Sequence, residues 1–282
     1  MELNDKDLGI SKPVPYEKMS ESARILRDTY AIKPGARIYQ KEFGYYCLEA
    51  WIERGEVDEK TVMDPVKRKE IFGYDDDAQF FLPVIGGCEA PFDPYYPEMV
   101  LEDRGEHEVV QDKVGRRVLC FKGRRNGFMP EYLDHPVKDK KTWEENCKWR
   151  MDPGSKDRFK NLDIHMAKAV KAAREGQIVT QYVVGGYMYL RSLIGPVELL
   201  YMFYDNPKLI HECMEAWLAV ADRLTEEYQK HVTVDEILFD EDICYNKGSL
   251  ISPEMIREFL MPYYQQYIQN VKRRQLDKER HL

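Results

Sequence analysis

Three consecutive carboxylates are the residues of this chain best suited to acid–base chemistry. Asp240, Glu241 and Asp242 directly follow the apolar run at 237–239. If residues 236–239 form a buried parallel strand, the three acids lie at its carboxyl end, where parallel α/β proteins place their substrate sites. Crowded carboxylates in a partly dry cleft repel one another, so one of them can keep a proton near neutral pH and act as a general acid. A solvated acidic turn is the alternative interpretation.

A glycine turn flanked by tyrosines provides a second group of candidates. Gly185 and Gly186 interrupt the chain after the β-rich run 177–184, with Tyr182 before them and Tyr187 after them. Glycines let the backbone approach a ligand closely, and a phenol offers a hydrogen-bond donor on an apolar ring. We expect these four residues to contact a substrate. A loop with packed aromatic rings is the alternative.

Histidines and cysteines give weaker signals. His135 lies beside Asp134 in the loop 129–137 and is a candidate acid or base, with a loop-fixing hydrogen bond as the alternative. His211 and Cys213 have a metal-like spacing, but residues two apart on a helix point about 200° away from each other and cannot share one ion. Phosphate-binding glycine motifs, the Gly-x-Ser-x-Gly elbow and His-Glu-x-x-His are absent from the sequence. We assign no metal ligands in this chain.

Composition narrows the class of protein. The 282 residues include 42 Lys and Arg against 50 Asp and Glu, a net charge of -8, and 43% of them are hydrophobic. An acidic chain does not favour nucleic-acid binding, and no apolar run is long enough to predict a membrane span. The six cysteines are scattered, and the first thirty residues lack the apolar core of a signal peptide. We therefore expect a reduced, soluble, cytoplasmic protein that binds a small molecule, neither nucleic acid nor membrane.

The elements that must position these residues alternate between strands and helices. Periodicity and turn signals predict helices at 20–30, 45–54, 142–149, 164–175, 206–228 and from 252 onward. The predicted strands are 36–43, 79–85, 177–184 and 236–239, with an antiparallel meander at 98–103, 106–111 and 116–122. We also expect a loop at 126–136, a capping box formed by Thr142 with Glu145, and a kink at Pro262.

Alternating strands and helices favour a parallel α/β sheet or barrel. A closed (β/α)8 barrel needs eight strand–helix units, whereas four are recognisable before Leu282. The expected fold is therefore a TIM-type (β/α)8 barrel that is incomplete. We expect one domain over 1–282, with an N-terminal extension at 1–35, the meander at 98–122 as an insertion, and truncation at the C-terminus.

The block 237–264 (ILFDEDICYNKGSLISPEMIREFLMPYY) resembles the uroporphyrinogen decarboxylase superfamily, which includes corrinoid-dependent methyltransferases. Its strand end, Ser-Pro-Glu helix start and Pro-Tyr follow the order of the family. The segments 180–195 and 41–55 and the loop at 129–136 are similar to the uncharacterised branch. The resemblance covers about 30–275 and implies a TIM-type barrel with its pocket at the carboxyl ends of the strands. It matches Tyr182 to the family's active-site tyrosine.

The chain departs from the decarboxylase pattern at two places. The family's Arg-Gln-Ala-Gly-Arg block binds substrate carboxylates, but residues 42–46 here are EFGYY and carry no cation. We expect Glu42, at the first strand end, and Tyr45 to contact the substrate instead. The family's serine after the fourth strand corresponds to Glu241 or Asp242. Without the arginines, the resemblance to the methyltransferase branch is the better guide.

That resemblance implies methyl transfer between a small methylated compound and a corrinoid carried by a partner protein. Asp240, Glu241 and Asp242 would polarise or protonate the leaving group while Tyr182 and Tyr187 orient it. Zinc, which the methyltransferase branch holds with a His-x-Cys and a later Cys, would need ligands beyond Leu282.

Two alternatives remain open. One is decarboxylation of uroporphyrinogen or another carboxylated tetrapyrrole, with an acid protonating the carbon left behind. The other is a non-catalytic binding or partner module whose open sheet edge is covered by another chain, either through self-association as a homodimer or within a longer natural protein.

Overall fold

The computed structural model describes residues 15–42, 47–123 and 130–276 of a mixed α/β protein. The chain divides into two compact units. The smaller unit contains the described residues of 15–80 together with 171–178, and the larger unit contains those of 81–170 and 179–276. Among the described helices, none is long and apolar enough to cross a membrane.

The smaller unit consists mainly of short helices after a 3₁₀ turn. They are η1 (Tyr16–Lys18), α1 (Glu21–Tyr30), α2 (Leu48–Glu53), α3 (Glu59–Met63) and α4 (Pro65–Phe72). Ser20 caps α1 by accepting a hydrogen bond from the backbone N–H of Ala23 at 3.2 Å, at the start of the helix predicted for 20–30. A small buried cluster holds the unit together and is formed by Met19, Ala23, Leu26, Ala78 and Ile178.

The prediction of a strand at 36–43 was wrong for residues 36–42, the part that the structure describes, because these residues form no strand. The backbone N–H of Tyr39 donates to the Thr29 hydroxyl at 2.9 Å, and that of Gln40 donates to the Asp75 carboxylate at 2.8 Å. Side chains therefore take the hydrogen bonds that a neighbouring strand would have made.

A three-stranded sheet contains β1 (Gln79–Phe81), β6 (Ile178–Val184) and β7 (Glu236–Asp240), with β6 in the centre. β6 and β7 are parallel, and Tyr182 lies opposite Leu238. The strand predicted at 79–85 is shorter than expected. Pro83 cannot donate to the ladder, and the chain rejoins β6 only through a bridge at Ile85. The described residues do not close a barrel.

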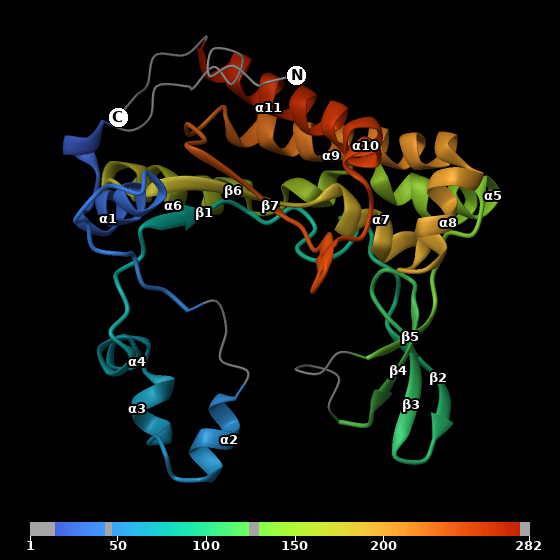
Figure 1. Cartoon of the computed structure of the whole chain (residues 1–282), viewed down its shortest axis with the longest axis horizontal. Helices are drawn as coiled ribbons and strands as arrows, with labels where there is room; N and C mark the ends of the chain where they lie inside the picture. Colours follow the sequence, from blue (N-terminus) through green and yellow to red (C-terminus); the bar gives the residue numbers. More distant parts are fainter. Residues whose placement is uncertain (1–14, 43–46, 124–129, 277–282) are drawn as a thin grey trace. The chain divides into compact units, whose positions relative to one another are not determined.

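Two long helices of the larger unit cover one face of β6 and β7 and run alongside them in Figure 1. They are α9 (Pro207–Tyr228) and α11 (Met261–Leu276). Phe239 of β7 stacks on Tyr264 with ring centroids 4.6 Å apart, and the Trp217 indole N–H donates to the Val184 carbonyl at 2.8 Å. Asn206 caps α9 as predicted. A π-helical turn, η5 (Ile256–Leu260), directly precedes α11, and the kink expected at Pro262 stays a prediction.

Shorter helices complete the larger unit. They are α5 (Lys140–Thr142), the π turn η2 (Trp143–Cys147), the 3₁₀ turns η3 (Lys148–Met151) and η4 (Lys156–Phe159), α6 (Leu162–Arg174), which spans both units, α7 (Gly186–Ile194), α8 (Glu198–Asp205) and α10 (Pro253–Met255).

The capping box predicted for Thr142 with Glu145 was wrong: Asp139 is the cap, and Thr142 closes the box with it. The hydroxyl of Thr142 satisfies the backbone N–H of Asp139, so the helix starts three residues earlier.

The antiparallel meander is confirmed and gains a strand. Its strands are β2 (Met99–Arg104), β3 (His107–Gln111), β4 (Arg117–Phe121) and β5 (Glu131–Asp134), which lie in that order (Figure 1). β5 falls where a loop was expected. It forms because Tyr132 pairs with Val118 across the ladder, a contact that local sequence patterns do not show. A short hairpin of β8 (Cys244–Tyr245) and β9 (Gly248–Ser249) follows β7.

Candidate functional site

A carboxylate, a phenol and a thiol meet at the carboxyl end of β6 and β7. Asp240 is the last residue of β7, and the Tyr182 hydroxyl forms a hydrogen bond with its side chain. The Cys88 thiol, on the loop after β1, donates to the Asp240 Oδ2 at 3.6 Å. Since β6 and β7 are parallel and in register, Tyr182, Leu238 and Asp240 share one face of the sheet.

Both donors keep their protons at neutral pH. Burial raises the pKa of Tyr182 well above its usual value, and the hydrogen bond to Asp240 adds to this effect. Burial and the Asp240 charge also raise the pKa of the Cys88 thiol. The Tyr182 ring packs edge-on against Phe81 at 6.4 Å between centroids. Asp240 is therefore arranged to accept hydrogen bonds from two groups beside a partly open aromatic surface.

Glu241 has a different environment, because successive side chains at a strand end point to opposite faces. Its carboxylate accepts the backbone N–H groups of Tyr187 at 3.0 Å and Met188 at 3.1 Å, and it also accepts the Tyr264 hydroxyl. Burial, followed by the Glu241 charge, raises the pKa of Tyr264 far above its usual value. Glu241 thus supplies the negative charge that stabilises the N-terminus of α7.

Asp242 points in a third direction. Its side chain is 56% exposed and forms an ion pair with Arg191 at 2.7 Å. The crowding expected of the three consecutive acids is therefore not found, since each carboxylate has its own partners. Asp240 meets the Tyr182 hydroxyl, whereas Glu241 meets the backbone of Tyr187.

The glycines predicted to admit a ligand are instead packed against the chain itself. A Cβ atom on Gly185 would overlap the side chain of Glu241, and one on Gly186 would lie 2.7 Å from Met214. Tyr187 is fully buried, and its hydroxyl has no hydrogen-bond partner among the described residues. Its expected role in orienting a substrate stays a prediction.

His135 packs beside the meander. The residue is 8% exposed, and its ring lies 5.8 Å from that of Tyr132. Burial, then the charges of Arg116 and Lys138, lowers its pKa to about 4, so the imidazole is neutral at pH 7. Its neighbours include Gly195, the C-cap of α7, and belong to a different region from the edge that carries Asp240. The structure does not bring it together with the carboxylate.

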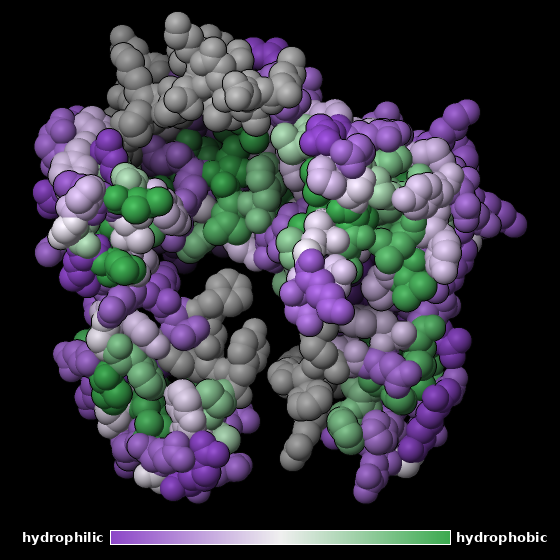
Figure 2. Space-filling model, viewed as in Figure 1, coloured by the Kyte–Doolittle hydropathy of each residue, from purple (hydrophilic) through white to green (hydrophobic). Residues whose placement is uncertain are grey.

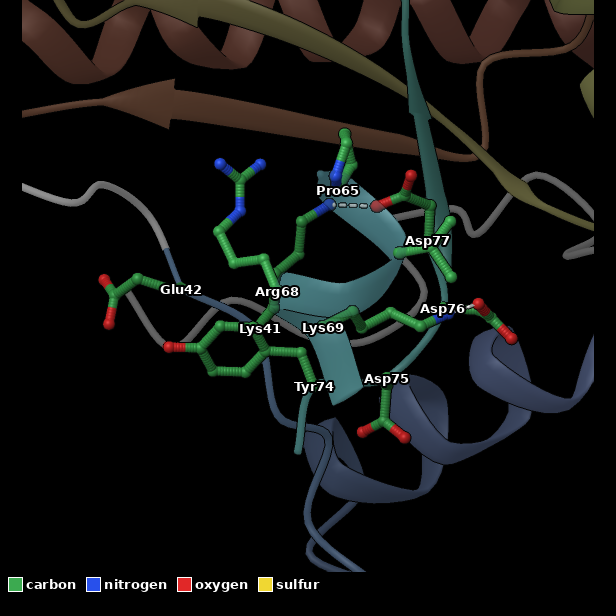
Figure 3. A pocket seen from close by; sticks show the side chains of 10 residues that line it. Lys41, Glu42, Pro65, Arg68, Lys69, Tyr74, Asp75, Asp76 and Asp77 are labelled. Atoms are coloured by element: carbon green, nitrogen blue, oxygen red, sulfur yellow. Dashed lines mark hydrogen bonds and ion pairs between the residues drawn. The ribbon is translucent and has the colours of Figure 1, made fainter. Parts of the chain in front are cut away.

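Glu42 lines a cavity of about 340 Å³ in the smaller unit (Figure 3). The side chains around it carry opposite charges that pair with one another. Lys41 binds Asp77 at 2.7 Å, and Lys69 binds Asp76. The cavity is therefore lined by internal ion pairs. Tyr45, the other residue expected to contact a substrate near here, lies outside the described residues.

The zinc ion that the resemblance implies does not fit the side chains found here. In the described parts of the chain, no three His, Cys, Asp or Glu side chains are arranged to hold a metal ion. Cys88 and Asp240 provide two such groups, fewer than the three or four protein ligands of a zinc site. We therefore derive no step through a zinc ion held by this chain.

Sequence reasoning missed Cys88 and Tyr264. Cys88 follows the Gly86–Gly87 turn after β1, so the strand-end rule applied to β7 could have found it. Tyr264 contacts Glu241 from α11, and nothing in the local sequence indicates that pairing. Neither a protein-family model, nor a curated protein, nor a solved structure matches this chain.

Proposed function

We propose that this chain belongs to the uroporphyrinogen decarboxylase superfamily and that its fold is related to the TIM-type barrel. In this proposal the chain transfers a methyl group between a small methylated compound and a corrinoid carried by a partner protein. The observation that carries the chemistry is the meeting of Tyr182 and Cys88 at the Asp240 carboxylate. It lies at the carboxyl edge of parallel strands, where α/β enzymes hold their reacting groups. The resemblance supplies the reaction class, and the geometry supplies the proton-transfer group.

Asp240 is the group that moves a proton. When a thiol or hydroxyl takes up the methyl group, its X–H proton passes to Asp240 as the X–C bond forms. A corrinoid would supply the methyl carbon in this direction and retain the electron pair of its broken bond to carbon; in the opposite direction it would accept the carbon, and the leaving oxygen or sulfur would retain the electron pair of the broken X–C bond. In the opposite direction the carboxyl group returns the proton to the leaving oxygen or sulfur. Tyr182 remains protonated and orients that atom.

The test uses free cob(I)alamin and a panel of methyl ethers and thioethers, with the corrinoid absorbance as the readout. We expect the purified chain to accelerate methyl transfer from one of them, and Asp240→Asn to reduce the rate by about 10²-fold or more. Asp242→Asn is the matched control, because Asp242 is exposed and ion-paired, and it should stay within about twofold of the parent.

Two outcomes would contradict the proposal. One is an Asp240→Asn variant as active as the parent. The other is turnover of uroporphyrinogen in place of methyl transfer, which would favour decarboxylation. Arg191 forms an ion pair with one of the three acids, Asp242, at 2.7 Å. That pairing weighs against binding of a substrate with many carboxylates.

A non-catalytic partner module is the second candidate, and one observation favours it. β7 is an edge strand of its sheet, and all five of its residues are only half-buried. Hydrophobic residues are visible at the position of β6 and β7, as they are over several other parts of this face (Figure 2). Such an edge tends to pair with another chain. Light scattering tests the homodimer: a strict monomer at micromolar concentration would count against this candidate.

A further inference from the structure

The loop that carries Cys88 is fixed at both ends. A Cβ atom on Gly86 would lie 2.5 Å from the Glu89 carbonyl and 2.6 Å from Val184, so this turn fits tightly against the end of β6. At the other end, the backbone N–H of Ala90 donates to the Ser192 hydroxyl at 3.1 Å. Cys88 lies between these two fixed points.

The middle of the loop is held by the meander. One carboxylate oxygen of Glu89 forms an ion pair with Lys113 at 2.9 Å, and the other forms an ion pair with Arg116 at 2.8 Å. The Arg116 side chain is only 9% exposed. Burial alone would raise the pKa of Glu89, but the two cations outweigh it and hold the pKa below its usual value. The carboxylate next to Cys88 is therefore charged and doubly bound.

The turn that presents these cations is itself rigid. The Asp112 carboxylate accepts a hydrogen bond from the backbone N–H of Val114 at 3.1 Å. It also accepts two hydrogen bonds from Arg116, one from the backbone N–H at 2.9 Å and one from the side-chain Nε at 2.6 Å. The guanidinium lies 4.8 Å from the centre of the Tyr132 ring of β5. Arg116 is therefore oriented by its own meander before it meets Glu89, and little conformational entropy is lost in that contact.

We infer that the four-stranded meander β2–β5 is a clamp that positions the Cys88 thiol against Asp240, with Arg116 and Glu89 as positioning residues. The inference rests on the proposed function only in taking Asp240 as the group that moves the proton. Through the clamp, the thiol supplies a hydrogen bond that fixes the orientation of the Asp240 carboxylate. An insertion in the sequence then becomes part of the machinery of the site.

The test measures the alkylation of Cys88 by iodoacetamide from pH 6 to pH 10. The parent for all variants carries Cys47→Ser and Cys244→Ser, which leaves Cys88 as the exposed cysteine of the described residues. We expect its rate to rise at a pH above that of an ordinary thiol, and Asp240→Asn to lower that midpoint. Glu89→Gln should also lower it, but the Glu89 charge itself raises the pKa of Cys88, so Arg116→Gln is the decisive variant. Loss of a cation alone would not lower the midpoint, whereas loss of the clamp should lower it and raise the rate at pH 8 by about threefold or more, since one pKa unit is tenfold in thiolate.

Arg117→Gln is the matched control, because Arg117 is the next residue of the same meander and pairs with the exposed Glu102 at 2.8 Å. It should leave the profile unchanged. Arg116→Lys keeps the positive charge but cannot bind Asp112 and Glu89 with two separate nitrogen atoms. Its alkylation profile should lie between those of the parent and Arg116→Gln, and it replaces Arg116→Gln as the test if that variant fails to fold.

An unchanged midpoint in Glu89→Gln and in the folded Arg116 variants would overturn the clamp. So would an unchanged midpoint in Asp240→Asn, because the contact being positioned would then be absent. No turnover is needed for this readout. If the alkylation profiles of the variants shift but the chain transfers no methyl group, the clamp is upheld and the proposed function is rejected. If the chain transfers a methyl group but the alkylation profiles do not shift, the proposed function is upheld and the clamp is rejected.

Discussion

Replacement of Glu241 is the sharpest test of how the end of β7 is built. We expect Glu241→Ala to destabilise the larger unit, because the carboxylate is an acceptor for the first turn of α7 and for Tyr264. Glu241→Gln keeps the shape of the side chain and loses its charge. It should therefore be the milder change.

The magnitude follows from the bonds that are lost. A hydrogen bond to a charged group contributes about 1.5–3 kcal/mol, and a charge at a helix N-terminus contributes about 0.3–1 kcal/mol. Glu241 accepts two backbone N–H groups and the hydroxyl of the largely buried Tyr264, but water can satisfy part of what is exposed. We expect Glu241→Ala to lower the free energy of unfolding by about 3–5 kcal/mol, and Glu241→Gln to lower it by about 1–2 kcal/mol.

Urea unfolding at pH 7, followed by the fluorescence of the buried Trp217 and by circular dichroism, measures these values. Asp242→Ala is the control, since its exposed ion pair should contribute less than about 1 kcal/mol. Added acetate should recover part of the stability of Glu241→Ala, and chloride at the same ionic strength should not. A loss in Glu241→Ala no larger than in Asp242→Ala would refute the assignment.

Three further outcomes follow from burial and backbone conformation. His135 has its pKa lowered to about 4 by burial, Arg116 and Lys138, so the unfolded chain takes up a proton below pH 6.5 before the folded one does. Stability is lost as the pH falls from about 6.5 to 4, and His135→Asn should flatten this loss by up to about 3 kcal/mol in acid unfolding curves. Burial raises the pKa of Tyr264, so stability should fall as the pH rises above about 10, with tyrosinate absorbance at 295 nm appearing together with unfolding. Gly176→Ala places a Cβ atom against the backbone of Lys18 at a φ of +81° and should lower the thermal midpoint, whereas Gly73→Ala, with open space and a φ of +69°, should lower it less.

Local signals located many elements correctly. Ser20, Asn206 and Ser252 cap helices that begin where the sequence predicts them, because a cap depends on a side chain and a backbone N–H only two or three residues away. The parallel strands at the centre of the sheet were predicted from their β-rich composition and the glycines or acids that end them. The acids were therefore placed at the carboxyl end of β7, where the structure has Asp240.

The partners of each acid were beyond local reasoning, although one signal was available. The two-residue period of a strand separates Glu241 from Asp240 and Asp242, so the three could have been split between two faces at once. That Glu241 then meets α7 and Tyr264, and that Cys88 meets Asp240, required contacts across 23 and 152 residues. Contacts between residues distant in the sequence also explain why the fourth strand of the meander, β5, forms and why residues 36–42 form no strand.

The sequence by itself determined where helices begin, which runs become strands and which end of a strand carries the acids, since these depend on interactions between near neighbours. The tertiary structure alone decided which carboxylate meets the Cys88 thiol and which stabilises the start of a helix. Only the folded chain brings a distant hydroxyl, thiol or backbone N–H within hydrogen-bond distance, and that proximity sets the environment of each acid.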